Sequence, residues 1–127
     1  MPDTKKKTVL IIDDDRFLLN MYSVKLKSSG FNVDTVVSGL EALSKLREGV
    51  RPDVILLDMV MPSMDGLELL ENFRKENFIG KSKIIVLSNQ NQPGDIERAK
   101  TFGIASYIVK ASSIPSDVVN EVLKITS

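Results

Sequence analysis

Apolar residues along the chain fall into short, continuous runs that are separated by stretches with helical spacing. Four runs have the length of a strand: TVLII from Thr8, DVILL from Asp53, KIIVL from Lys83 and ASYIV from Ala105. Continuous runs are typical of strands that are covered on both faces, as in a parallel sheet. A fifth segment, FNVDTV from Phe31, alternates apolar or β-branched residues with polar ones, which predicts a half-exposed edge strand.

The stretches between these strands carry the signals of amphipathic helices. Apolar residues recur at helical intervals in two of them, at Leu18, Tyr22 and Leu26 and at Val118, Val122 and Ile125. Capping pairs, in which an acid follows the cap by three residues, predict helix starts at Ser38 with Glu41 and at Asp65 with Glu68. Further helix signals are a possible cap at Asp15, a stop at Gly30 and a first-turn proline at Pro115.

A strand followed by a helix, repeated five times with short connections, predicts a doubly wound α/β domain of the (βα)5 type. Right-handed crossovers and the single edge strand favour a flavodoxin-like, five-stranded parallel sheet in the order 2-1-3-4-5. A length of 127 residues predicts one domain over 1–127. Residues 1–7 are predicted to form a flexible tail, and the last helix is expected to leave no room for an output domain.

Composition narrows the possible functions. Lys plus Arg and Asp plus Glu both number 17, so we expect no direct binding to nucleic acid or to a membrane. No run has the length of a signal-peptide core or a membrane span, and the cytoplasm is the expected location. The absence of cysteine and histidine excludes disulfides, thiol catalysis and imidazole bases, so any chemistry must use carboxylates, hydroxyls and amines.

Polar residues stand at the carboxyl ends of four predicted strands, where ligands bind in sheets of this kind. They are Asp13, Asp14 and Asp15 after the first strand, Asp58 after the third, Ser88 after the fourth and Lys110 after the fifth. Two carboxylates about 4 Å apart repel each other by about 4 kcal/mol at an effective dielectric constant near 20, so the cluster requires protons or a cation. Oxygen-only ligands favour Mg²⁺, or Mn²⁺ as an alternative. A metal, an ammonium and a hydroxyl around a carboxylate suit phosphoryl transfer.

The sequence resembles bacterial response-regulator receiver domains. The motifs VLIIDDD, DVILLDMVMPSMDGLELL, IIVLS and YIVK match the family in order and at the expected intervals, and the resemblance covers essentially the whole chain. It implies Mg²⁺-dependent phosphorylation of Asp58 by a histidine kinase, a histidine phosphotransfer protein or a small acyl phosphate. It also implies a two-state switch, in which phosphorylation changes the face formed by helix four, strand five and helix five. A downstream protein target would bind this face.

The resemblance also assigns roles to single residues. The ligands of Mg²⁺ would be Asp14, Asp58, the backbone carbonyl of Val60 and, through water, Asp13. Lys110 would pair with a phosphoryl oxygen, and the hydroxyl of Ser88 would turn towards the phosphoryl group. Tyr107 matches the aromatic switch residue, whose ring moves inward as Ser88 moves.

Two segments differ from the family pattern. Proline usually follows the active-site lysine, often after a cis peptide bond, whereas this chain has Ala111. A cis bond before another residue costs about 2.5 to 4 kcal/mol, which predicts a trans bond and a rearranged loop. After Ser88, where a small residue is common, the chain has Asn89 and Gln90. Together with Val60, these two residues are predicted to influence the access of phosphoryl donors and water.

Two other functions stay open at this point. A phosphohydrolase of the haloacid dehalogenase type would use Asp13 as its nucleophile and Asp15 as a second acid. Such an enzyme needs a cap domain, for which we expect no room, and the MPSMDG loop fits the receiver family far better. The other alternative is a receiver-like module that binds proteins without phosphorylation. Failure of Asp58 to react with any donor would support that alternative.

Overall fold

The computed structural model of the chain describes residues 7–61, 64–78, 82–88, 93–110 and 114–126. Within these ranges the strands are β1 (Thr8–Ile12), β2 (Asn32–Val36), β3 (Val54–Asp58), β4 (Lys83–Ser88) and β5 (Ser106–Val109). The helices are α1 (Arg16–Ser28), α2 (Gly39–Arg47), α3 (Gly66–Lys75), α4 (Pro93–Lys100) and α5 (Pro115–Thr126). None of these helices is both long and apolar enough to cross a lipid bilayer.

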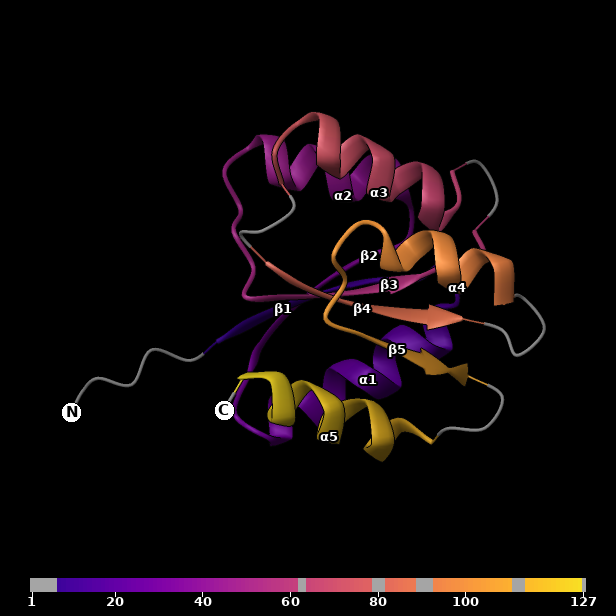
Figure 1. The fold of residues 1–127 in the computed structure, drawn as a ribbon. Coiled ribbons are helices and arrows are strands. Elements are labelled where there is room, and N and C mark those ends of the chain that lie inside the picture. Colours follow the sequence, from indigo (N-terminus) through magenta and orange to yellow (C-terminus); the bar gives the residue numbers. More distant parts are fainter. Residues whose placement is uncertain (1–6, 62–63, 79–81, 89–92, 111–113, 127) are drawn as a thin grey trace.

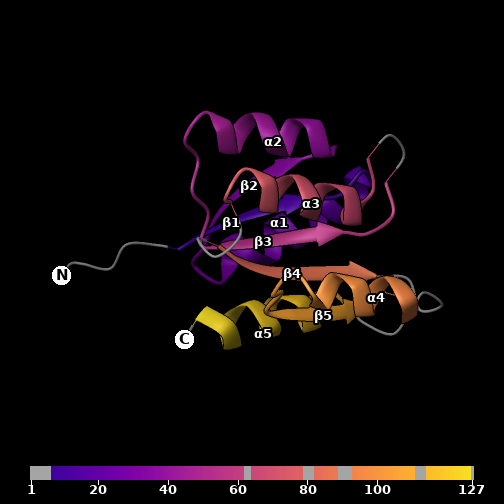
Figure 2. The ribbon, with the colours of Figure 1, turned by 45° about the horizontal axis from the view of Figure 1, so that its top comes forward.

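The strands form one parallel sheet in the order β2-β1-β3-β4-β5. This order confirms the predicted fold. Helices α2, α3 and α4 lie on one face of the sheet, and α1 and α5 lie on the other (Figures 1 and 2). Because all strands run in the same direction, the carboxyl ends of β1, β3, β4 and β5 lie at one edge of the sheet, and the predicted site residues belong to that edge.

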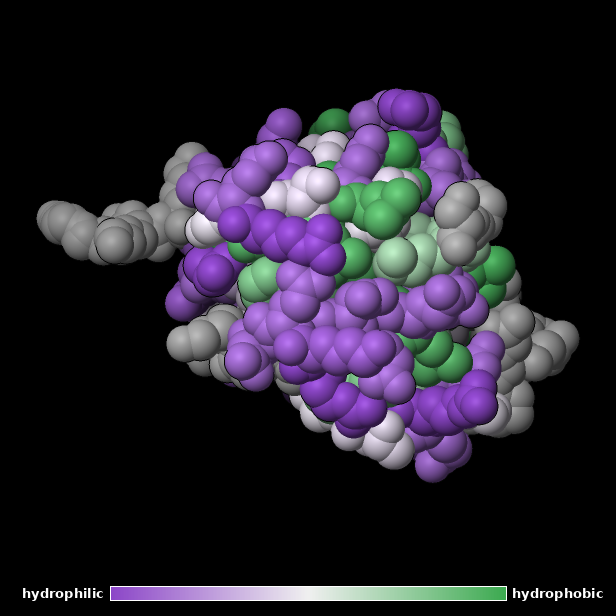
Figure 3. Space-filling model, turned by 90° about the horizontal axis from the view of Figure 1, so that it is seen from above, coloured by the Kyte–Doolittle hydropathy of each residue, from purple (hydrophilic) through white to green (hydrophobic). Residues whose placement is uncertain are grey.

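The core consists of two apolar layers, one on each side of the sheet. In β1, Leu10 and Ile12 pack towards α2, α3 and α4, while Val9 and Ile11 pack towards α1 and α5. All four side chains are fully buried. Since successive residues of a strand face opposite sides, a strand covered on both sides requires a continuous apolar run, as the sequence shows. The outer surface over α2 and α3 is mostly hydrophilic, with smaller hydrophobic areas among the polar side chains (Figure 3).

The edge strand β2 differs in detail from the predicted alternation. Phe31 and Val33 pack on the side of α1 and α5, as expected, but Thr35 is exposed and Val36 is buried on the opposite side. Asp34, expected to face solvent, is half-buried and forms an ion pair with Lys45 of α2 at 3.1 Å. The reason is that helices flank both faces of β2, so neither face is uniformly exposed.

The predicted helix starts and the predicted stop are found in the structure. A side-chain oxygen accepts a hydrogen bond from a first-turn amide at three helix starts: Asp15, Ser38 and Asp65. At α2, however, the carboxylate of Glu41 accepts from the amide of Val37 at 2.9 Å, one residue before the amide of Ser38 that the pattern predicts. Gly30 follows α1 with a φ of +98°, a conformation that glycine adopts without strain, and this confirms the predicted stop.

Gly66, the first residue of α3, packs directly against the backbone that follows Asp58. A Cβ atom at this position would lie 2.8 Å from Cα and 2.7 Å from Sδ of Met59, and the amide of Gly66 donates to the carbonyl of Met59 at 3.0 Å. Because Met59 directly follows β3 and its amide donates to the carbonyl of Leu87 at 3.0 Å, its backbone has little room to move. We expect Gly66→Ala to lower the free energy of unfolding by about 1 to 3 kcal/mol in urea denaturation.

The matched control for this substitution is Gly94→Ala in α4, where an added Cβ meets no atom within 4 Å. Alanine is the better helix former, so this variant should be as stable as the parent protein or more stable. Equal stability of the two variants would show that the backbone after Asp58 yields to the added methyl group.

Candidate functional site

Three carboxylates gather at the carboxyl edge of the sheet. Asp13 and Asp14 follow β1, and Asp58 ends the neighbouring strand β3. Asp13 is fully buried and Asp58 is 4% exposed, whereas Asp14 is exposed to solvent. One oxygen from each carboxylate lies within 4.8 Å of the others. The cluster therefore joins two buried acids to one that solvent can reach.

Strand alternation explains why the buried charges converge. Residues two apart in a strand point to the same face of a sheet. The buried acids Asp13 and Asp58 and the half-buried Lys110 each stand two residues after an apolar residue that packs on the side of α1 and α5: Ile11, Leu56 and Ile108. The three charges therefore lie at the end of one apolar layer.

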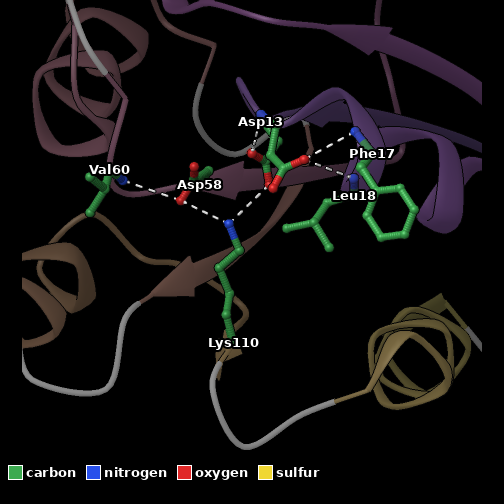
Figure 4. A network of polar contacts seen from close by, with 7 residues as sticks. Asp13, Phe17, Leu18, Asp58, Val60 and Lys110 are labelled. Atoms are coloured by element: carbon green, nitrogen blue, oxygen red, sulfur yellow. Dashed lines mark hydrogen bonds and ion pairs between the residues drawn. The ribbon is translucent and has the colours of Figure 1, made fainter.

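Backbone hydrogen bonds fix the two buried carboxylates. Asp13 Oδ1 accepts from the amide of Asp15 at 2.9 Å, and the amide of Asp13 donates to the carbonyl of Val36 in β2 at 3.2 Å. Asp58 Oδ1 accepts from the amide of Val60 at 3.2 Å (Figure 4). Each carboxylate thus accepts a hydrogen bond from the backbone amide two residues farther along the chain.

Asp15 has a different role from its two neighbours. Its carboxylate accepts hydrogen bonds from the amides of Phe17 and Leu18 at 3.0 and 3.2 Å and so caps α1. The phosphohydrolase alternative requires this residue as a second acid beside Asp13. Its engagement at the start of the helix speaks against that alternative.

Lys110 lies between the two buried carboxylates. Its Nζ is 3.1 Å from Asp13 Oδ2 and 3.5 Å from Asp58 Oδ1, and its side chain is 18% exposed (Figure 4). Burial lowers the pKa of this ammonium group, but the attraction of Asp58 and Asp13 outweighs burial and raises the pKa above its ordinary value. Lys110 is therefore protonated at neutral pH and offsets part of the negative charge.

The carboxyl group of Asp58 is strongly perturbed. Burial and the repulsion of Asp13 raise its pKa from 3.8 to about 7, although Lys110 and the amide of Val60 lower it. One ammonium group thus does not fully compensate two buried acids. Near neutral pH, the remaining charge favours the uptake of either a proton or a cation.

The donor set of the cluster suits a hard divalent cation. The carboxylate oxygens of Asp13, Asp14 and Asp58 are separated by no more than 4.8 Å. Ligands of an octahedral ion with bonds of about 2.0 to 2.1 Å stand roughly 3 to 4 Å apart, so a small adjustment would bring the three oxygens around one ion. This geometry supports the predicted Mg²⁺ site. The carbonyl of Val60 as a further ligand stays a prediction.

Ser88 and Tyr107 contrast sharply in their surroundings. Ser88 is fully buried at the end of β4, and its Oγ has no hydrogen-bond partner within the described part of the chain. A buried hydroxyl without a partner is costly, so a new acceptor or donor beside it would be stabilising. Tyr107 in β5 is 41% exposed, with Nζ of Lys100 5.2 Å from the centre of its ring.

The segments in which the chain departs from the family pattern lie outside the described residues. They contain Ala111, for which we predict a trans peptide bond and a rearranged loop, and Asn89 and Gln90, for which we predict an effect on access. Lys110 nevertheless reaches both buried carboxylates. The substitution of proline by Ala111 thus does not keep the lysine from the cluster.

Two neighbours of the site have no signal in the sequence. One is Lys100, which contacts Tyr107. The other is Tyr22, predicted only as part of an apolar helix face. Burial raises the pKa of the Tyr22 phenol, Lys110 opposes this rise and Asp13 adds to it, so the phenol lies within electrostatic range of the cluster. Both contacts join elements whose side-chain directions a linear pattern does not reveal.

Comparison with known proteins agrees with this geometry. Residues 9–122 match the family model described as response regulator receiver domain. The DNA-binding response regulator MtrA of Mycobacterium tuberculosis is 31% identical over 108 residues, which are 85% of this chain and 46% of MtrA, so the chain spans about half the length of that relative. The polar-differentiation response regulator DivK of Brucella anthropi is 31% identical over 109 residues, 86% of this chain and 88% of DivK.

A solved structure extends the comparison to three dimensions. The chemotaxis protein CheY4 of Vibrio cholerae superposes with a TM-score of 0.84 at 28% identity and covers 94% of this chain and 98% of its own. The match of the family model over most of the chain, the sheet order and the acidic cluster lead to one conclusion. This chain belongs to the response regulator receiver domains of two-component systems.

Proposed function

We propose that the chain is a phosphoryl-accepting signalling switch and that Asp58 is its phosphoacceptor. The observation that carries this proposal is the position of Asp58, a buried carboxylate at the end of a central strand and 3.5 Å from the ammonium group of Lys110. Phosphoryl transfer depends mostly on positioning and charge neutralisation. Groups held at the ends of strands meet that requirement without a histidine.

In the proposed reaction, a carboxylate oxygen of Asp58 attacks phosphorus. The bond between phosphorus and the donor atom breaks, and its electron pair leaves with the donor. The donor is a phosphohistidine on a histidine kinase or histidine phosphotransfer protein, or a small acyl phosphate, because this chain has no histidine of its own. Lys110 pairs with one phosphoryl oxygen, and the buried hydroxyl of Ser88 turns towards another.

The proposed cofactor is Mg²⁺, with Mn²⁺ as a substitute. Its ligands would be Asp14, Asp58, the carbonyl of Val60 and, through water, Asp13. When bound, the ion supplies positive charge that offsets the buried acids and the oxygens of the phosphoryl group. Two observations support this assignment: the spacing of the three carboxylates and the raised pKa of Asp58, which indicates negative charge that Lys110 leaves uncompensated.

The output of the switch is a shift between two conformations. As Ser88 approaches the phosphoryl group, the ring of Tyr107 turns inward, and the face formed by α4, β5 and α5 changes for a downstream protein target. A coupling of about 1 to 3 kcal/mol between two such sites shifts populations five- to 150-fold. In this proposal residues 1–127 act as one domain in the cytoplasm, and the chain assists only the gain and loss of its own phosphoryl group.

The proposal is tested by incubation with acetyl phosphate and Mg²⁺ followed by intact-mass measurement. We expect one phosphoryl adduct that disappears with EDTA and in Asp58→Asn. The matched control is Asp53→Asn, which removes an exposed acid just before the opposite end of the same strand and should keep the adduct.

Other outcomes point elsewhere. A folded, Mg²⁺-binding protein that never gains the adduct would contradict the proposal and favour a binding module that works without phosphorylation. Turnover of an external phosphate ester that depends on Asp13 but not on Asp58 would point to the phosphohydrolase.

A further inference from the structure

Lys100, the last residue of α4, lies over the ring of Tyr107. Its Nζ is 5.2 Å from the ring centroid, within the range of attraction between an ammonium group and an aromatic face. The register of the sheet explains the contact, because Tyr107 pairs with Val86, whose side chain packs on the side of α2, α3 and α4. Figures 1 and 2 both show α4 beside β5. The outward ring of Tyr107 therefore meets the C-terminal end of α4.

The ammonium group of Lys100 is held from a second side. Its Nζ is 3.4 Å from Oε2 of Glu97, one helical turn earlier in α4. An acid three residues before a lysine stabilises such a pair on a helix surface. Glu97 thus favours a position of Lys100 from which the ammonium group also reaches the ring of Tyr107.

We propose that Lys100 is a positioning residue that holds Tyr107 in its outward orientation and so opposes the switch. This inference rests on the proposed function, in which the ring of Tyr107 turns inward on phosphorylation. When the ring turns inward, it moves away from the surface on which Lys100 lies. The contact between Lys100 and Tyr107 therefore stabilises only the conformation with the outward ring. A ligand or contact that favours one of two states shifts the equilibrium by its differential interaction alone.

Loss of this contact should raise the population of the inward conformation. At an exposed site, an interaction of this kind corresponds to a change of about two- to fivefold in an equilibrium constant. Because coupling between equilibria is reciprocal, a protein with more of the inward conformation should also hold a phosphoryl group with a more favourable free energy. Lys100→Gln is therefore expected to raise the equilibrium ratio of phosphorylated to unphosphorylated protein, at a fixed ratio of acetyl phosphate to acetate, by about two- to fivefold.

The fluorescence of Tyr107 tests directly whether Lys100 holds its ring outward. There are two tyrosines and no tryptophan, so Tyr22→Phe leaves Tyr107 as the only strongly fluorescent side chain. In this background, acrylamide quenching measures how far the Tyr107 ring is exposed, and a neutral quencher does not respond to the charge of Lys100. We would compare the unphosphorylated background protein with its Lys100→Gln, Lys100→Arg and Lys75→Gln variants. Lys75→Gln removes the same charge from the last turn of α3.

We expect weaker quenching for Lys100→Gln alone. Lys100→Arg should resemble the background protein, because a guanidinium group also stacks on an aromatic ring. Equal quenching in Lys100→Gln and Lys75→Gln would overturn the inference, even where Asp58 accepts a phosphoryl group normally. If no variant accepts a phosphoryl group, the proposed function fails, whereas the quenching comparison still decides whether Lys100 holds the ring outward.

Discussion

Replacement of Lys110 by methionine should slow the phosphorylation of Asp58 by about 100-fold or more. Methionine retains most of the apolar stem but removes an ammonium group that lies 3.1 Å from Asp13 and 3.5 Å from Asp58. Loss of one preorganised charge or donor at a reacting group typically reduces the rate about 10²- to 10³-fold. The measurement is the rate of adduct formation with acetyl phosphate at saturating Mg²⁺, followed by intact mass.

The pH dependence of this variant separates a chemical role of Lys110 from a structural one. Lys110 lowers the pKa of Asp58, so its removal should raise that pKa above about 7 and leave more of the nucleophile protonated at neutral pH. The rate of Lys110→Met should therefore rise with pH beyond the point at which the parent rate is constant. Lys75→Met, which removes a surface lysine from α3, should match the parent at every pH. If Lys110→Met forms the adduct at the same rate as the parent protein, Lys110 has no role in the reaction.

The fold and the positions of the site residues could be predicted because parallel strands leave strong signals. Strand β1 is buried on both faces, so its sequence is continuously apolar, and its end is marked by a change to acids. Since all strands of such a sheet end at one edge, residues as distant in sequence as Asp13 and Lys110 are expected to meet, and they lie 3.1 Å apart. Residues that follow different strands in the sequence therefore lie close together in the structure.

The sequence predicts the helix cap at Asp15, but it does not predict which of the two preceding acids is buried and which is exposed. The three consecutive acids after β1 become a fully buried ion-pair partner, an exposed acid and a helix cap: Asp13, Asp14 and Asp15. This division depends on where the chain turns into α1. The contact of Lys100 with Tyr107 likewise depends on the approach of α4 to β5, a tertiary distance that neither periodicity nor motif spacing contains.

In buffer without divalent cations, the free energy of unfolding should fall as the pH rises from about 4 to about 7. The pKa of Asp58 is about 7 in the folded protein, compared with 3.8 for an unperturbed carboxyl group. Between these values the folded protein holds a proton that the unfolded chain has released, so folding takes up a proton and a higher pH opposes it. At about 1.4 kcal/mol per pKa unit, the loss reaches about 4 kcal/mol at most. The contribution is constant below and above this window.

Urea denaturation in EDTA at a series of pH values measures this effect, and two variants assign it. Asp58→Asn should lose the decrease, while Asp53→Asn, altered at an exposed acid, should keep it. Near pH 7.5, Mg²⁺ should restore stability to the parent protein far more than to Asp58→Asn, because the ion replaces the missing proton as the compensating charge. An equal pH slope in the parent and in Asp58→Asn would mean that another group takes up the proton. The uncompensated charge that destabilises the metal-free protein at neutral pH is also the reason that the site attracts a cation. In the proposed mechanism that cation, once bound, keeps Asp58 ionised for attack on phosphorus.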